Sequence, residues 1–172
     1  MTDVEDNKDD TEAGTFDIKR AYPGQMYGST KTYDFNVGFS CCFRQWRAQS
    51  HCRFLHGYAL KFHFEFITNK LDEKNWAVDF GSLKSLKGWL EDMFDHTTLV
   101  AKDDPLISTF REMHIAKMID MRIVEATGCE ATARLVYEYT EQWLKDNGYG
   151  HITLGRVSVH EHSGNSAFYG IY

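Results

Sequence analysis

Apolar and polar side chains alternate along two stretches in the first half of the chain. Within residues 33–43 the odd positions are apolar and most even positions are polar or glycine, and residues 55–67 repeat the alternation, with Tyr58 in phase with the aromatic residues that follow. A period of two is typical of a strand with one buried face. His56 has the same parity as Tyr58, so its imidazole is predicted to point toward the core rather than toward solvent.

Two later stretches repeat their apolar residues at helical spacing. They run from about residue 82 to 94 and from about 130 to 147, and each would present an apolar stripe to a core. Ser82 is a suitable N-cap for the first helix, because its hydroxyl can accept a backbone N–H. Asn147 and Gly148 are suited to end the second helix.

The remaining elements decide the fold class. A last strand is predicted over residues 152–161, where Glu161 shares a face with two valines. A fourth strand is expected within 152–172 or within 115–125, where residues 121–124 could form a short strand. The long connection at 103–126 would serve as a lid or an oligomer contact. This order of elements favours an α+β fold, with an antiparallel four-stranded sheet covered by two helices.

Charge is concentrated at one end of the chain. Residues 1–14 hold six acidic side chains and one lysine, which accounts for most of the net charge of −6, so we expect a disordered acidic tail followed by one domain over residues 15–172. The nearly neutral remainder lacks the basic patch that nucleic acid requires. Neither a membrane-spanning stretch nor a targeting signal is apparent, so we expect a cytoplasmic protein with no nucleic-acid or membrane partner.

Of the four cysteines, one has neighbours that suit chemistry. Cys41, Cys42 and Cys129 are interpreted as packing groups, because they form no paired CxxC element. Cys52 follows His51 and precedes Arg53. Nearby cations lower the pKa of a thiol and allow it to act as a base or nucleophile.

Three further positions carry candidate acid–base or binding groups. Asp95 and His96 follow the first predicted helix, and a carboxylate beside an imidazole can relay protons. Glu161 ends a strand on an otherwise apolar face, where a carboxylate is costly unless it binds something, such as the guanidine-like edge of a pterin. Glu130, at the start of the second helix, is a weaker candidate because it would also favour the helix dipole.

Several motifs, taken in order, resemble the 6-pyruvoyl- and 6-carboxy-tetrahydropterin synthase family. The resemblance spans roughly residues 33–172 and rests on FSCCF at 39–43, CRFLHGY at 52–58, VDFGSLK at 78–84, FDH at 94–96 and VHE at 159–161. It implies a tunnelling-fold subunit that self-associates into a trimer or hexamer, with sites between subunits. It also implies that Cys52 is the catalytic base, that Asp95 and His96 complete a triad, and that Glu161 anchors the pterin.

The same resemblance implies a zinc ion held by three histidines, and here the sequence departs from the family. His56 keeps its place as a ligand, but Phe43 and Tyr58 stand at the other two positions. A catalytic zinc normally has three protein ligands and polarises its substrate as a Lewis acid.

Three outcomes follow from this departure. The metal site could be rebuilt with Cys41, His51, His114 or His162. A metal-free reaction could rely on the loop cations Arg44 and Arg47. The protein could instead bind a pterin without converting it.

By resemblance, the expected activity is that of a carbon–oxygen lyase acting on 7,8-dihydroneopterin triphosphate. The expected product is 6-carboxy-tetrahydropterin, which feeds the synthesis of queuosine and other 7-deazaguanines. The alternative is a non-catalytic pterin-binding or oligomeric homologue that has lost the zinc site.

Overall fold

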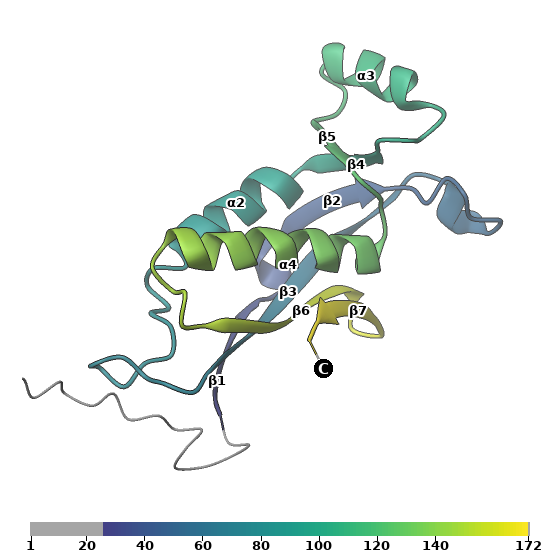
Figure 1. Ribbon diagram of the computed structural model, residues 1–172. Coiled ribbons are helices and arrows are strands. Elements are labelled where there is room, and N and C mark those ends of the chain that lie inside the picture. Colours follow the sequence, from purple (N-terminus) through teal and green to yellow (C-terminus); the bar gives the residue numbers. More distant parts are fainter. Residues whose placement is uncertain (1–25, 172) are drawn as a thin grey trace, which may run out of the picture.

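The longest strand, β3 (His56–Thr68), organises the sheet of this protein, whose computed structural model describes residues 26–171. One edge of β3 pairs antiparallel with β2 (Phe39–Phe43) near its start and with β1 (Tyr27–Tyr33) along the rest of its length. Its other edge pairs with β6 (Thr153–His162). Figure 1 shows β3 running through the middle of the sheet.

Three more strands extend the sheet on its two sides. β4 (Thr97–Ala101) pairs with β2, β5 (Met121–Val124) pairs with β4, and β7 (Asn165–Gly170) pairs with β6. The first two pairings are parallel and the third is antiparallel. The prediction of a four-stranded antiparallel sheet is therefore wrong in two respects, because the sheet has seven strands within residues 26–171 and β4 and β5 pair in parallel. The predicted α+β class is confirmed.

The parallel pairing of β4 with β5 follows from the connection between them. Strands β4 and β5 are joined by helix α3 (Ile107–Ile115), and a crossover of that kind returns the chain in the same direction. The expected extra strand at 121–124 is confirmed as β5, and the other expected location, residues 152–172, holds β7 as well.

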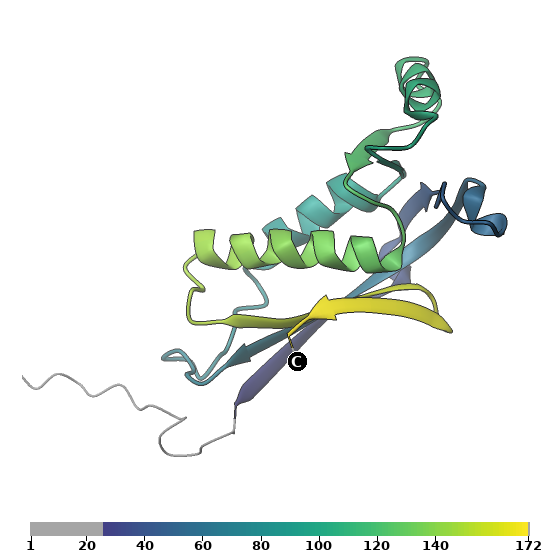
Figure 2. The same cartoon turned by 45° about the vertical axis from the view of Figure 1, so that its right-hand side comes forward.

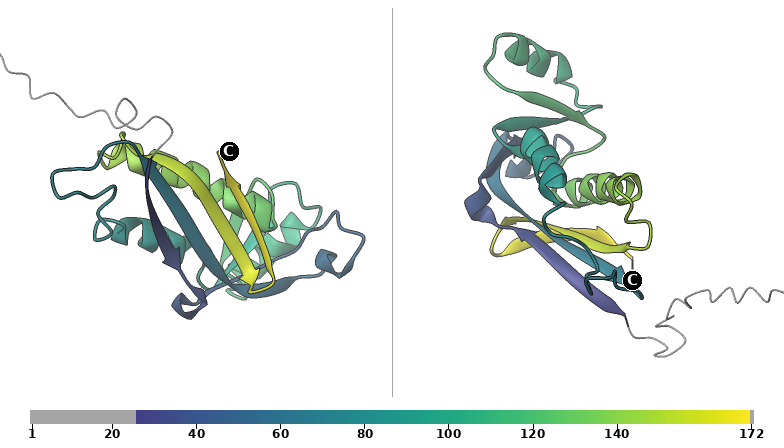
Figure 3. Two further views of the ribbon diagram at one scale, coloured as in Figure 1. Left: turned by 90° about the horizontal axis from the view of Figure 1, so that it is seen from below. Right: turned by 90° about the vertical axis from the view of Figure 1, so that its left-hand side faces the viewer.

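Two helices cover one face of the sheet, as the sequence predicts. These are α2 (Lys84–Phe94) and α4 (Cys129–Asp146), which lie side by side over the same face in Figures 2 and 3. Their buried side chains meet a row of phenylalanines from β3, and the rings of Phe62 and Phe94 lie 5.0 Å apart between centroids. Helix α3 projects beyond this layer, beside β4 and β5.

Two local predictions are wrong. The alternation over 33–43 is not one strand, because the Asp34 carboxylate accepts the backbone N–H of Phe35 at 2.8 Å and starts a single turn of 3-10 helix, which Gly38 closes with φ 85°. Ser82 does not cap α2. Its hydroxyl donates instead to the backbone oxygen of Asp79 at 2.7 Å, and the helix begins two residues later.

The other boundaries fall close to their predicted places. Helix α4 ends at Asp146, with Asn147 and Gly148 following it, and Gly148 adopts the left-handed conformation at φ 81°. No helix within residues 26–171 is long and apolar enough to cross a membrane. The predicted acidic tail, residues 1–14, lies outside the described part of the chain.

Candidate functional site

Three aromatic rings converge where β2 ends and β3 begins. Phe43 pairs directly with His56 across the two strands, and their ring centroids are 5.2 Å apart. Tyr58 lies two residues along β3 on the same face, 5.6 Å from His56 and 6.3 Å from Phe43 between centroids. The strand register thus gathers the three positions that the family resemblance assigns to zinc ligands, and the inward direction predicted for His56 agrees with this contact.

The side chains at these positions do not fit a zinc ion. Phe43 has no donor atom, and Nδ1 of His56 lies 2.7 Å from the backbone oxygen of Phe54. Since a carbonyl oxygen only accepts, that nitrogen carries a hydrogen and only Nε2 remains for a ligand. Within residues 26–171, no group of three or more His, Cys, Asp or Glu side chains could hold a metal ion.

The residues considered for a rebuilt metal site are scattered or engaged elsewhere. Cys41 is buried, and the Thr97 hydroxyl donates to its sulfur at 3.7 Å. Nδ1 of His114 accepts the backbone N–H of Met121 beyond α3, and Nδ1 of His162 accepts that of Gly164. His51 lies exposed in the short turn η2 (His51–Arg53). In one chain, these residues do not rebuild the zinc site.

Cys52 is presented by a loop that is fastened at several points. The loop runs from the end of β2 into η2, where the Ser50 hydroxyl accepts the backbone N–H of Cys52 at 3.4 Å. The backbone oxygen of Cys52 accepts in turn from the N–H of Gln45 at 2.9 Å. Cys52 is half-buried, so its thiol lies at the surface of a segment with fixed ends.

Two arginines tie this loop to the turn after β4. Arg44 donates through Nε and a terminal nitrogen to the two oxygens of Asp104, at 2.8 and 2.6 Å. Arg47 and the indole of Trp46 both donate to Asp103. Hydrogen bonds from Arg44 hold the pKa of the Asp104 carboxyl below its usual range. The two guanidiniums therefore already have carboxylate partners, which argues against their serving as the cations of a metal-free reaction.

Asp95 and His96 are in direct contact at the end of α2. Nδ1 of His96 lies 2.6 Å from a carboxylate oxygen of Asp95. His96 has φ 57°, the left-handed region, where a side chain with a Cβ is disfavoured by about 1 kcal/mol or more. Backbone strain of this kind is concentrated at functional sites.

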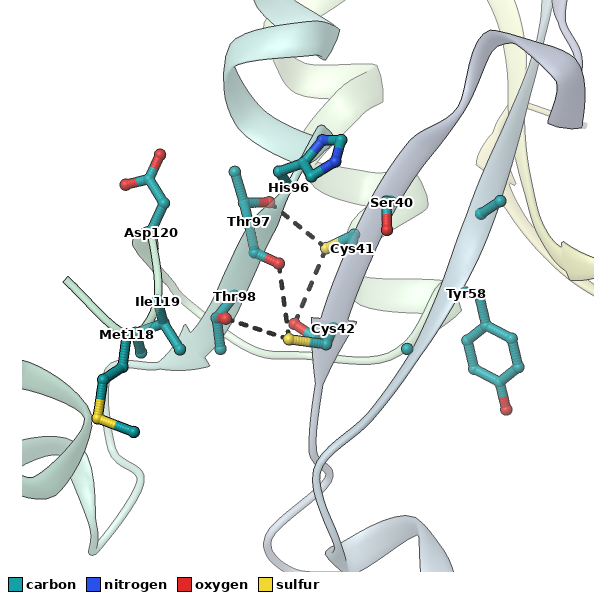
Figure 4. Close-up of a pocket in the computed structure, with 12 residues that line it drawn as sticks. Ser40, Cys41, Cys42, Tyr58, His96, Thr97, Thr98, Met118, Ile119 and Asp120 are labelled. Carbon is teal, nitrogen blue, oxygen red and sulfur yellow. Dashed lines mark hydrogen bonds between the residues drawn. The ribbon is translucent and has the colours of Figure 1, made fainter. Parts of the chain in front are cut away.

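His96 borders a pocket of about 490 Å³ on the sheet face that the helices leave uncovered. The pocket floor includes Cys42 and Thr98, whose sulfur and hydroxyl lie 3.1 Å apart. Figure 4 shows His96 above these residues, while the ring of Tyr58 points away from them. Two neighbouring surfaces result, one on each side of the β2–β3 ladder.

Glu161 lies on the helix side, close to the start of α4. Burial, followed by the charges of Glu161 and Glu130, raises the pKa of the Cys129 thiol to about 12. The pKa of Tyr58 is also raised, by burial first and then by Glu161, Cys52 and Cys129. The charges of Cys52 and Glu161 thus both contribute to the raised pKa of Tyr58. Glu130, in contrast, is exposed in the first turn of α4.

The predicted site residues thus fall into two groups. His56 lies beside Tyr58, whose ring is 6.2 Å from that of His162, next to Glu161, and Cys52 lies in the loop that leads into the same strand. His96, in contact with Asp95, borders the pocket over Cys42 and Thr98. Within residues 26–171, no hydrogen bond or ion pair joins Cys52 to Asp95 or His96. Sequence reasoning treated Tyr58 only as a lost zinc ligand, although the parity of Tyr58 in its strand already placed its ring beside His56.

Known proteins resemble this chain in sequence and in fold. Residues 33–171 match the family model described as 6-pyruvoyl tetrahydropterin synthase. The chain is 32% identical over 95 residues to a 6-carboxy-5,6,7,8-tetrahydropterin synthase of Rickettsia bellii, covering 55% of this chain and 66% of that protein. A protein of the same name from Aquifex aeolicus is 25% identical over 130 residues, covering 73% of this chain and 76% of that protein.

The chain spans between half and two thirds of the length of the Rickettsia relatives that it matches, at 55% for the Rickettsia conorii protein and 66% for the Rickettsia bellii protein. Among solved structures, an uncharacterized protein of Wolinella succinogenes superposes with a TM-score of 0.72 at 18% identity, covering 85% of this chain and 98% of its own. A Plasmodium vivax 6-pyruvoyltetrahydropterin synthase gives 0.61 at 14% identity, covering 84% and 97%. These structures confirm the α+β tunnelling fold.

Proposed function

Because the chain belongs to the 6-pyruvoyl tetrahydropterin synthase family, we propose that it is a lyase of the 6-carboxy-tetrahydropterin synthase type. Its substrate would be 7,8-dihydroneopterin triphosphate, and its product would enter the synthesis of queuosine and other 7-deazaguanines. The names of the curated relatives support this choice over the pyruvoyl product.

The observation that carries the proposal is the Asp95–His96 contact at the strained end of α2. A hydrogen bond from Nδ1 to the carboxylate orients the imidazole and leaves Nε2 to exchange a proton with a substrate. An oriented acid–base pair of this kind accelerates reactions by roughly 10²–10⁴-fold.

The other roles follow from position. Cys52, on its fastened loop, removes a proton from the carbon side chain of the substrate. His96 passes protons to and from the reacting oxygen, with Asp95 holding its ring. Glu161 accepts N–H groups from the guanidine-like edge of the pterin, because a paired and charge-assisted contact is what a half-buried carboxylate needs.

We further propose that the complete site forms between subunits of a trimer or hexamer. Cys52 and His96 make no contact within one chain, so His96 of one subunit would face Cys52 of its neighbour. The sheet has exposed ends at β5 and β7 that are suited to pairing with another copy.

A second function is favoured by one observation, the loss of metal ligands at Phe43 and Tyr58. Without zinc the protein could bind a pterin and leave it unchanged. Turnover of 7,8-dihydroneopterin triphosphate by the full chain separates the two functions. The lyase requires measurable turnover that falls at least 10²-fold in Cys52→Ala and in His96→Ala, with the exposed His151→Ala as control. If the wild type and both variants are inert while all bind neopterin, the binding function replaces the lyase.

A further inference from the structure

The aromatic cluster of Phe43, His56 and Tyr58 brings together the three positions of the family's zinc ligands, but its side chains include only one imidazole. Phe43 and His56 are directly paired across the β2–β3 ladder, and Tyr58 completes the cluster from the same strand face. Phe43 is only 2% exposed, so a hydrocarbon ring fills the place of a ligand. With a single imidazole available, the cluster is far from the three protein ligands of a catalytic zinc.

Two polar atoms remain at this cluster, and their chemistry is complementary. Nδ1 of His56 donates to the backbone oxygen of Phe54 at 2.7 Å, and in this tautomer Nε2 is an acceptor. The Tyr58 hydroxyl makes no hydrogen bond to any residue in the range 26–171, and a phenol is a good donor. A donor and an acceptor on two rings whose centroids lie 5.6 Å apart suit one hydroxyl group, which accepts from one and donates to the other.

The surroundings of Tyr58 connect this cluster to the proposed reaction. The Tyr58 ring lies 6.2 Å from the ring of His162, the neighbour of Glu161 in β6. Burial, followed by the charges of Glu161 and Cys52, raises the pKa of the Tyr58 phenol. Arg44 and Arg47, the other polar candidates of the loop, are held by Asp104 and Asp103. Tyr58 is thus a donor without a hydrogen-bond partner among residues 26–171, on the same strand as His56.

We propose that the protein works without zinc and that the Tyr58 hydroxyl, with Nε2 of His56, binds and polarises the side-chain oxygen of the substrate in place of the metal. This inference rests on the proposed lyase function. The phenol keeps its proton throughout and donates a hydrogen bond to the oxygen on which negative charge develops, while Cys52 takes the proton from carbon. Removal of one preorganised donor of this kind lowers kcat by roughly 10²–10³-fold.

Metal content tests the first half of the proposal without reference to activity. Purified full-length protein, dialysed against zinc-containing buffer and then against metal-free buffer, is expected to retain far less than one zinc per chain by elemental analysis. The double variant Phe43→His with Tyr58→His rebuilds three imidazoles on one face and is expected to retain about one zinc per chain, with Phe43→His alone as the matched control. A wild type that retains one zinc per chain overturns the proposal, as does a folded double variant that retains none.

Tyr58→Phe tests the second half, because it removes one oxygen atom and preserves the ring contacts. We expect kcat to fall by about 10²–10³-fold with a small change in KM. The control is Tyr149→Phe, which removes a phenol bonded to the Ser82 hydroxyl at 2.7 Å, away from the cluster. An unchanged kcat in Tyr58→Phe overturns the assignment of the donor.

A wild type that lacks turnover would count against the lyase, and the Tyr58 contact would then be tested by binding. Neopterin carries side-chain hydroxyls and unsubstituted pterin does not. Tyr58→Phe should weaken neopterin binding by about 5-fold or more, which corresponds to the roughly 1 kcal/mol of one hydrogen bond, and leave pterin binding unchanged. Equal effects on the two ligands, or none, overturn the proposal even if the protein is only a binder.

Discussion

The guanidinium of Arg44 and the carboxylate of Asp104 face each other edge to edge, with Nε and a terminal nitrogen at 2.8 and 2.6 Å from the two oxygens. The Asp104 side chain is 1% exposed. The pair joins the start of the Cys52 loop to the turn that leads into α3. The segment expected to act as a lid or an oligomer contact is therefore attached at its base to the loop that carries Cys52, the candidate base.

Asp104→Asn should destabilise the protein by about 2–4 kcal/mol, because it leaves a partly buried guanidinium without its counter-charge. The free energy of unfolding in urea measures the loss. The matched control is Glu125→Gln, which breaks the exposed Lys102–Glu125 pair at 2.6 Å and should cost no more than about 1 kcal/mol. Equal losses in the two variants would show that burial does not strengthen the Arg44–Asp104 pair.

The same pair predicts a pH dependence. Its hydrogen bonds lower the pKa of Asp104 in the folded state, while the unfolded value is about 3.9. The contribution to stability is therefore fully present above about pH 4 and is lost as pH falls through the lower folded value. Urea titrations from pH 7 downward should show the gap between wild type and Asp104→Asn narrowing only below about pH 4. A gap that closes between pH 6 and pH 5 would contradict the assignment to this carboxyl.

His96→Gly should separate stability from activity. Glycine adopts the φ of 57° without strain, so the free energy of unfolding should stay unchanged or rise by up to about 1 kcal/mol. Turnover should fall by about 10²–10⁴-fold, because the imidazole is lost. Lys117→Gly, at an exposed position with φ 58°, should match the stability effect and leave turnover intact. A large stability loss in His96→Gly would indicate that the histidine is structural.

The four thiols should differ in their reactivity toward iodoacetamide at pH 8. Burial raises the pKa of Cys41 and of Cys129 to about 12, so only about one molecule in 10⁴ would carry either thiolate at that pH. Cys52 is half-buried in a surface loop and should be alkylated first. Peptide mass spectrometry over time, with and without denaturant, gives the order. Early modification of Cys129 would mean that the start of α4 opens readily.

The elements with a strong hydrophobic period could be predicted from the sequence. The elements that could not be predicted lack such a period for physical reasons. The alternation over 55–67 and the stripe over 130–147 each lie within one residue of β3 and α4. Strand β4 is buried on both faces, so its sequence TTLVA has no alternation to detect. Helix α3 buries only Phe110, so its apolar stripe is too weak to identify.

The sequence predicts a set of candidate site residues but not how they are arranged. Motif spacing identified Cys52, Asp95, His96 and Glu161, and adjacency in sequence matched the Asp95–His96 contact. Nothing in the spacing indicates that Arg44 and Arg47 are already held by aspartates some 56–60 residues away. The partners of long polar side chains depend on loop packing, which leaves no period in the sequence.

Strand β3 holds His56 and Tyr58 at one end and is bonded along both edges to three other strands. Its amide hydrogens in the middle of the strand can exchange with solvent only when the sheet comes apart, so they should be among the slowest in the protein. His56 and Tyr58 thus lie at one end of the strand whose backbone hydrogen bonds should open most rarely. The spacing of these two rings is set by the backbone and should persist through the local openings that free loops undergo.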